Sequence, residues 1–190
     1  GLAHTKLVNL SGLINELNTP AAKLLNRDLF EAAITVLKNN NTILPIRDLD
    51  KSRIASVSVG RTQVTPFQKT LSLYTQVDHF LVPKDAAQPY LDSVMTRLKD
   101  YNQVIAGIHD DPGRPHNRIT FSQPVLSFVS SLATRGNVIV AVFKNPYVLG
   151  KLNSIENADG LIVTYQDSYD AEDLTEQLVF GGVSASGRLP

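Results

Sequence analysis

Six consecutive apolar residues, Val138 to Phe143, constrain the fold of this 190-residue chain more than any other feature. The run reads VIVAVF, and most of its residues are β-branched. A strand with one face toward solvent alternates apolar and polar residues, whereas a strand inside a parallel sheet is covered on both faces. The run therefore predicts a central parallel strand, and such a strand requires helices on both faces of its sheet.

Shorter apolar segments are also typical of strands, and helical patterns separate them. The segment 77–82 contains Asp78 and His79, so it is expected near an edge of the sheet. The other segments typical of strands are 54–59, 104–108 and 161–164. Helices are expected at 65–71, 86–99 and 124–132, and from about 168 to 181. This alternation predicts an α/β fold with an open, mostly parallel sheet and helices on both faces, a Rossmann-like or flavodoxin-like three-layer sandwich.

The first forty residues predict helices rather than strands. Thr19-Pro20 is a helix-start signal, because threonine caps a helix well and proline suits the first turn. Leu25, Leu29, Ala32 and Val36 follow at helical spacing, which predicts a helix that runs to about residue 38. Residues 1–18 are expected to form a connecting segment with a short helix, and residues 19–190 a single α/β domain.

The composition excludes several classes of function. Eighteen basic and eighteen acidic side chains cancel, and no block of lysine and arginine indicates a nucleic-acid partner. The chain has no cysteine, which excludes disulfides and zinc thiolates, and no apolar run reaches the ~20 residues of a membrane span. Gly60 stands without the further glycines of a phosphate-binding loop, so no cofactor is expected.

The richest polar stretch follows the segment 104–108 and reads HDDPGRPHN. Asp110, Asp111 and His116 are candidates for acid–base chemistry, and such side chains can also bind a metal, although we expect no metal site. His109 and Arg114 are candidates for the rim of a sugar-binding site. The alternative is that Asp-Pro-Gly forms a turn and the charged side chains are solvated.

Three tyrosines follow the last two predicted strands. Tyr147, Tyr165 and Tyr169 lie where ligands bind in open α/β sheets, beyond the carboxyl ends of the strands. An aromatic ring there can stack on a sugar, so all three are candidates for the rim. The alternative is that they pack where helices meet strands, with the hydroxyl groups in water.

Three segments, in this order, resemble the C-terminal domain of family 3 glycoside hydrolases. The first is AITVLKN at 33–39 with LPI at 44–46, which is similar to the entry of that domain. The second is VIVAVFKNPY at 138–147, and the third is the ending from residue 158 to GRLP at 187–190. Together the segments span nearly the whole chain from about residue 19.

The resemblance implies a (β/α)₈ barrel that precedes this chain in the same polypeptide and carries the aspartate nucleophile. In β-glucosidase-like members, a glutamate on a loop of the C-terminal domain supplies the acid/base. The comparable loop here has only Asp110 and Asp111 as acids. We therefore expect no catalytic residue in this chain and no activity from it alone.

The missing glutamate points to a parent of the β-N-acetylhexosaminidase type, in which the acid/base is an aspartate–histidine pair on a barrel loop. Bacterial proteins of that type can carry a β-lactamase-like domain downstream. The chain starts at Gly1 and ends at Pro190, which we interpret as the boundaries of a piece. A soluble, periplasmic or extracellular bacterial protein that acts on carbohydrate is the resulting expectation.

Three hypotheses about function stay open at this point. In the first, the domain packs on the barrel and lines one side of the sugar-binding cleft. In the second, it is a purely structural module between domains and does not contact substrate. In the third, it is an independent α/β hydrolase that uses the loop from His109 to His116.

Overall fold

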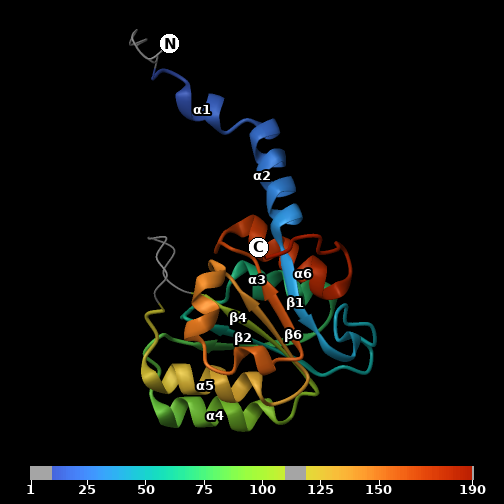
Figure 1. The fold of residues 1–190 in the computed structure, drawn as a ribbon, viewed down its shortest axis with the longest axis vertical. Helices are drawn as coiled ribbons and strands as arrows, with labels where there is room; N and C mark the ends of the chain where they lie inside the picture. The colour runs from blue at the N-terminus through green and yellow to red at the C-terminus, as the bar shows by residue number, and fades with distance from the viewer. Residues whose placement is uncertain (1–9, 110–118, 190) are drawn as a thin grey trace.

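The computed structural model describes residues 10–109 and 119–189, and a single six-stranded sheet forms its centre (Figure 1). The strands are β1 (Thr35–Asn39), β2 (Ile54–Val59), β3 (Val77–Val82), β4 (Gln103–Ile108), β5 (Val138–Val142) and β6 (Gly160–Val163). Their order across the sheet is β1-β6-β5-β4-β2-β3. The edge strand β1 pairs antiparallel with β6, and all other neighbours are parallel. The predicted open, mostly parallel sheet is confirmed.

Helices cover both faces of this sheet. One face carries α3 (Pro66–Tyr74) and α6 (Tyr169–Phe180), whereas the other carries α4 (Gln88–Leu98) and α5 (Gln123–Ala133). Two short 3₁₀ helices, η2 (Pro146–Lys151) and η3 (Ile155–Asn157), join β5 to β6 and pack on the α5 side. Each face has its own apolar core, so the domain is the predicted three-layer sandwich.

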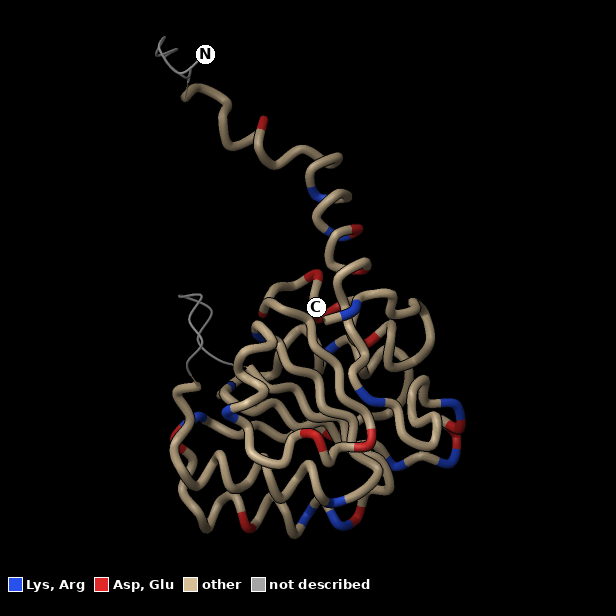
Figure 2. The backbone as a smooth tube through the Cα atoms, viewed as in Figure 1, with Lys and Arg blue, Asp and Glu red and all other residues tan. Residues whose placement is uncertain are grey.

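The central position of the VIVAVF run is confirmed. Strand β5 lies between β4 and β6, and all of its residues are buried. Val138, Val140 and Val142 belong to the core under α4 and α5, whereas Ile139 and Ala141 belong to the core under α3 and α6. No charged residue lies in β2, β4, β5 or β6, and the sheet interior is accordingly uncoloured in Figure 2. Strand β3, with exposed Asp78, is at an edge as predicted.

The N-terminal helix is shorter than predicted. Helix α1 (Leu13–Leu17) and helix α2 (Pro20–Ala33) precede β1, and a 3₁₀ turn, η1 (Asn40–Thr42), follows it. The predicted extension to residue 38 is wrong, because Thr35 and Val36 pair with Val163 and Ile162 of β6. Sheet pairing with a distant strand here overrides a helical spacing that Val36 continues by coincidence.

Candidate functional site

A group of polar side chains gathers at the carboxyl ends of the parallel strands. The register aligns Val59 with Ile108, Ile108 with Val142, and Val142 with Val163, so these four strands end side by side. The residues that follow the strands therefore meet at one edge of the sheet, which is where open α/β sheets bind ligands. We call Arg61, His109, Asp167 and Glu172 the strand-end cluster.

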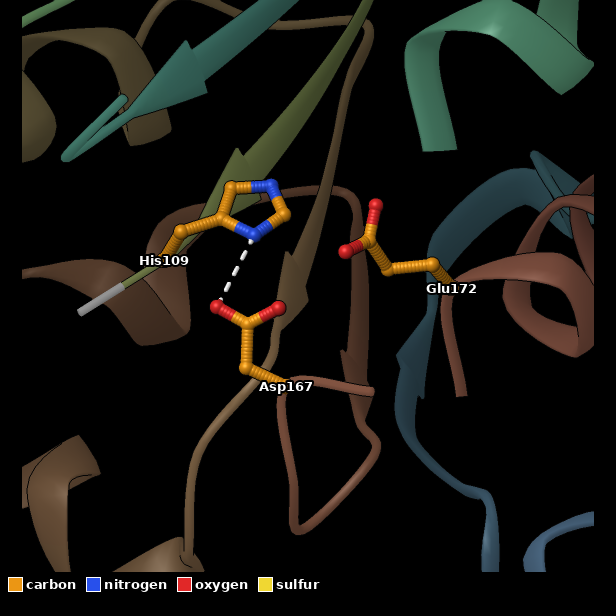
Figure 3. A group of neighbouring side chains, drawn as sticks. All are labelled: His109, Asp167 and Glu172. Carbon is orange, nitrogen blue, oxygen red and sulfur yellow. Dashed lines mark hydrogen bonds and ion pairs between the residues drawn. The ribbon is translucent and has the colours of Figure 1, made fainter. Parts of the chain in front are cut away.

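Asp167 connects the other members of the strand-end cluster. Its Oδ2 accepts a hydrogen bond from Nη2 of Arg61 at 2.5 Å, and the same oxygen lies 3.3 Å from Nδ1 of His109 (Figure 3). A carboxylate only accepts, so Nδ1 of His109 donates. The side chain of Asp167 is almost buried and that of Arg61 partly buried, so solvent screens this ion pair less than it would a surface pair.

His109 is held rigidly at the end of β4. Its backbone N–H donates to the carbonyl of Val59 at 2.9 Å, and its ring stacks on Phe143 with centroids 4.5 Å apart. A Cβ atom on Gly60 would lie 1.9 Å from the carbonyl oxygen of His109, and Gly60 also has φ +89°. A Cβ atom on Gly107 would lie 2.6 Å from Nε2 of His109. The two glycines thus make room for the backbone and for the ring of this residue.

The imidazole of His109 faces the protein interior. The residue is 0% exposed, and Nε2 has no hydrogen-bond partner among the described residues. Burial lowers the pKa of His109, and the neighbouring Asp167 opposes this shift. The ring is therefore neutral at pH 7, and it is enclosed by Gly107 and Phe143 instead of facing a cleft.

Glu172 links the cluster to the beginning of α3. Its Oε2 accepts a hydrogen bond from the backbone N–H of Phe67 at 2.7 Å, within the first turn of that helix. Burial raises the pKa of Glu172 to about 7, and the negative charge of Asp167 adds to this effect. The Phe67 hydrogen bond and the charge of Arg61 act in the opposite direction. The carboxyl group is thus close to half-protonated near neutral pH.

The cluster contains three potential metal ligands. One donor atom each from His109, Asp167 and Glu172 lies within 4.8 Å of the others. However, the guanidinium of Arg61 already occupies the carboxylate of Asp167 and supplies the positive charge that a metal would bring. A divalent cation bound beside this guanidinium would be repelled. The geometry favours a buried ion-pair network over a metal centre.

The sequence-based site candidates fall into three groups. Asp110, Asp111, Arg114 and His116 lie outside the described residues, and His109 is buried. Tyr147 in η2 and Tyr169 at the start of α6 are 73% and 65% exposed. Tyr165 is half-buried, and its hydroxyl shares a hydrogen bond of 2.8 Å with Oγ1 of Thr35.

Sequence reasoning missed three members of the cluster. Gly60-Arg61 was interpreted only as a turn, Asp167 was not singled out, and Glu172 was expected only to favour the positive end of the last helix. A usable signal was nevertheless present, because Arg61 and Asp167 directly follow two predicted strands. Polar residues that follow different strands of a parallel sheet converge at one edge.

Comparisons with known proteins identify the fold. No protein-family model matches the chain, and a sequence search of curated proteins finds no match either. Among solved structures, a family 3 β-N-acetylglucosaminidase from Paenibacillus sp. str. FPU-7 matches 98% of this chain, with a TM-score of 0.70 and 16% identity. The chain has the fold of one part of such enzymes.

Further matches agree with this identification. A fungal multi-domain family 3 β-N-acetylglucosaminidase matches 97% of the chain with a TM-score of 0.69 and 19% identity. A β-glucosidase from Listeria innocua, in complex with isofagomine, matches 88% with a TM-score of 0.65 and 14% identity. The chain spans only 35%, 20% and 26% of the three solved chains. The expected resemblance to family 3 glycoside hydrolases is thus confirmed at the level of the fold.

The described residues include no helix with both the length and the apolar character to cross a membrane.

Proposed function

We propose that this chain is the C-terminal α/β domain of a family 3 glycoside hydrolase and that it packs beside a catalytic barrel in the same polypeptide. The observation that carries the proposal is the match of nearly the whole chain to about a fifth to a third of such enzymes. The three sequence segments that resemble the family support it independently. The absence of a glutamate from the loop after β4 favours a β-N-acetylhexosaminidase-type parent over a β-glucosidase.

We assign the strand-end cluster a positioning role. Retaining hydrolysis needs two carboxyl groups about 5–5.5 Å apart on either side of the scissile bond, both in contact with the sugar. Glu172 is buried against Phe67, and His109 is enclosed between Gly107 and Phe143. Neither residue reaches a substrate, whereas both fix the end of β4, from which the loop 110–118 departs.

The two exposed tyrosines are the described candidates for contact with sugar. Tyr147 and Tyr169 follow β5 and β6, so both belong to the edge of the sheet where the strand-end cluster lies. Exposed aromatic rings beside a polar cluster are typical of carbohydrate contacts, because one face of a sugar is apolar. Tyr165 is less suited to this role, because its hydroxyl is engaged by Thr35.

Steady-state kinetics of the full polypeptide distinguish the three hypotheses. Alanine at Asp110, Asp111 and His116, and separately at Tyr147 and Tyr169, is compared with Leu73→Ala. Leu73 is an exposed leucine near the end of α3, at the opposite edge of the sheet. A role at the rim predicts KM raised about 3–10-fold by the tyrosine variants, with kcat unchanged, because a ring contact contributes ~1 kcal/mol.

Two other results would redirect the proposal. Unchanged kcat and KM in all variants would favour a purely structural module. A loss of kcat on substitution of Asp110, Asp111 or His116 would place catalytic groups in this domain and contradict its accessory role.

A further inference from the structure

Helix α2 presents its polar side to the domain and its apolar side to solvent. Nδ2 of Asn26 donates to Asp170, and Nη1 of Arg27 donates to Asp173, both at 2.6 Å, so these side chains attach α2 to α6. On the other side, Leu25 and Leu29 are 60% and 61% exposed. A helix that packs only on its own domain shows the reverse polarity.

The exposed apolar side of α2 forms a continuous stripe. Its members recur at helical spacing, are all exposed and carry no charge: Ala21, Ala22, Leu25, Leu29 and Ala32. We call these five residues the α2 stripe. Leu24 is exposed next to it, and Leu10, Ile14 and Leu17 continue the apolar surface into and around α1. Figure 1 shows both helices projecting from the body of the domain. So many exposed aliphatic side chains in about 20 residues indicate a surface that a partner covers.

The base of α2 lies at the same edge of the sheet as the strand-end cluster. Helix α2 leads directly into β1, whose first residue, Thr35, pairs with Val163 at the end of β6. Tyr165, which follows β6, also hydrogen-bonds to Thr35. A partner seated along α2 would therefore lie next to the edge that we propose faces the sugar.

We propose that the α2 stripe, continued by α1, is the docking surface for the domain that precedes this chain in the same polypeptide. The inference rests on the proposed function. In the Paenibacillus and fungal enzymes, this fold makes up 35% and 20% of the chain, so most of each chain is further structure. A match over 97–98% of the present chain is too extensive to leave out α2, so those enzymes retain a segment in its place.

The charges beside the stripe favour this occupant over a second copy of the chain. Asp28 and Glu31 line an open cleft of about 310 Å³ at the base of α2, together with Ala32, Ser184 and Ser186. In an antiparallel pair of α2 helices, the sides that carry these carboxylates would face each other and repel. The docking surface of the preceding domain is therefore expected to be apolar and to place a basic side chain opposite this cleft.

Hydrogen–deuterium exchange tests the proposal on two molecules, the 190-residue chain and the full polypeptide. The proposal predicts fast exchange of the α2 amides in the 190-residue chain and exchange at least about tenfold slower in the full polypeptide. Helix α5, which has five buried residues, serves as the internal reference and is expected to exchange equally in both.

Substitutions show whether the stripe itself is responsible. In the full polypeptide, Leu25→Ser with Leu29→Ser is expected to return α2 exchange to within about twofold of the rate in the 190-residue chain. Both leucines are exposed in the chain alone, so its own fold and the exchange of α5 are expected to survive. Leu73→Ser, which alters a leucine of α3 that is 80% exposed, is the matched control and should leave α2 protected.

The possible failures are distinguishable. Equal, fast exchange of α2 in both molecules would overturn the docking surface, and protection in the 190-residue chain that grows with its concentration would assign the stripe to a second copy. Hydrolysis of aryl glycosides is measured on the same samples. Turnover without protection of α2 refutes only the docking surface, whereas protection without turnover refutes only the proposed enzyme.

Discussion

Glu176 buries an acidic group between α6 and α3. The residue is 0% exposed, and neither carboxyl oxygen has a hydrogen-bond partner of normal geometry among the described residues. Burial raises its pKa from 4.5 to about 9, against a smaller opposing effect of the Thr70 hydroxyl. The folded protein therefore holds a proton at Glu176 that the unfolded chain releases above about pH 4.5.

The proton on Glu176 makes stability depend on pH with a defined sign. Between about pH 4.5 and 9, the folded state binds more protons than the unfolded state, so the free energy of unfolding falls as pH rises. Glu176→Gln removes this dependence and is expected to raise the free energy of unfolding by about 1–3 kcal/mol at pH 8.

Chemical denaturation at pH 4 and pH 8 measures this effect. At pH 4 the variant and the parent chain should differ little, because the carboxyl group is largely protonated in both the folded and the unfolded state. Glu156→Gln, at an exposed position in η3, is the control and should change stability by less than about 0.5 kcal/mol at either pH. Equal stabilities of Glu176→Gln and the parent at pH 8 would contradict the assigned pKa.

Gly107 is the residue on which the position of His109 most directly depends. A Cβ atom there would lie 2.6 Å from Nε2 of His109 and 3.2 Å from the ring of Phe143. The imidazole is buried and stacked, so it cannot move without disturbing its hydrogen bond to Asp167. Gly107→Ala is expected to cost about 1–3 kcal/mol of stability.

Gly150 provides the matched control for this prediction. It lies in η2, and a Cβ atom on it would meet no atom within 4 Å. Gly150→Ala should therefore be close to neutral in thermal unfolding. A melting temperature for Gly107→Ala equal to that of Gly150→Ala would show that the His109 ring is not confined as described.

At the residue scale, the sequence allowed only part of the candidate site to be predicted. His109 was recognised because it starts a polar stretch after a predicted strand, and the structure places it at the centre of the strand-end cluster. Asp167 and Glu172 lie about sixty residues further on, and their proximity to His109 depends on strand order and register. No local pattern contains that information.

Among the elements, α3 is stabilised by a reciprocal cap that the Thr65-Pro66 pair predicted in part. Oγ1 of Thr65 accepts from the backbone N–H of Gln68 at 3.2 Å, and Oε1 of Gln68 accepts from the backbone N–H of Thr65. Nε2 of Gln68 also donates to Oγ of Ser56 and to the carbonyl of Phe80. The cap thereby ties α3 to β2 and β3.

Removing the Thr65 hydroxyl tests this cap. Thr65→Val keeps the shape of the side chain but leaves the N–H of Gln68 without its acceptor, at an expected cost of about 1–2 kcal/mol in urea denaturation. Thr96→Val, at an exposed position within α4, is the control and is expected to cost less than about 0.5 kcal/mol. Equal effects of the two variants would mean that the cap contributes little.

Elements with strong local patterns were predictable, and those decided by distant partners were not. The β5 run and the helix from about 168 to 181 carry their own signals, namely continuous β-branched residues and a serine cap with a terminal glycine. The end of α2 does not, because helical spacing continues through Val36 while β6 recruits Thr35 and Val36 into the sheet. The apolar stripe of α2 likewise suggested a buried face, whereas the structure leaves it exposed.

At the scale of the whole molecule, the chain is a three-layer α/β sandwich with two helices that lie largely outside its own cores. The strand-end cluster and the base of α2 share one edge of the sheet. In our account this edge faces a barrel that holds the catalytic carboxylates. The domain then contributes position and contact, and the chemistry belongs to the rest of the polypeptide.

Hydrolysis of aryl β-N-acetylglucosaminide and aryl β-glucoside, by the 190-residue chain and by the full polypeptide, tests this account most directly. We predict turnover by the full polypeptide alone, with preference for the β-N-acetylglucosaminide. The isolated chain does not supply two carboxyl groups placed across a sugar at the separation that retaining hydrolysis requires, about 5–5.5 Å. Turnover by the 190-residue chain alone would contradict the account and make the loop from His109 to His116 the leading candidate for an active site.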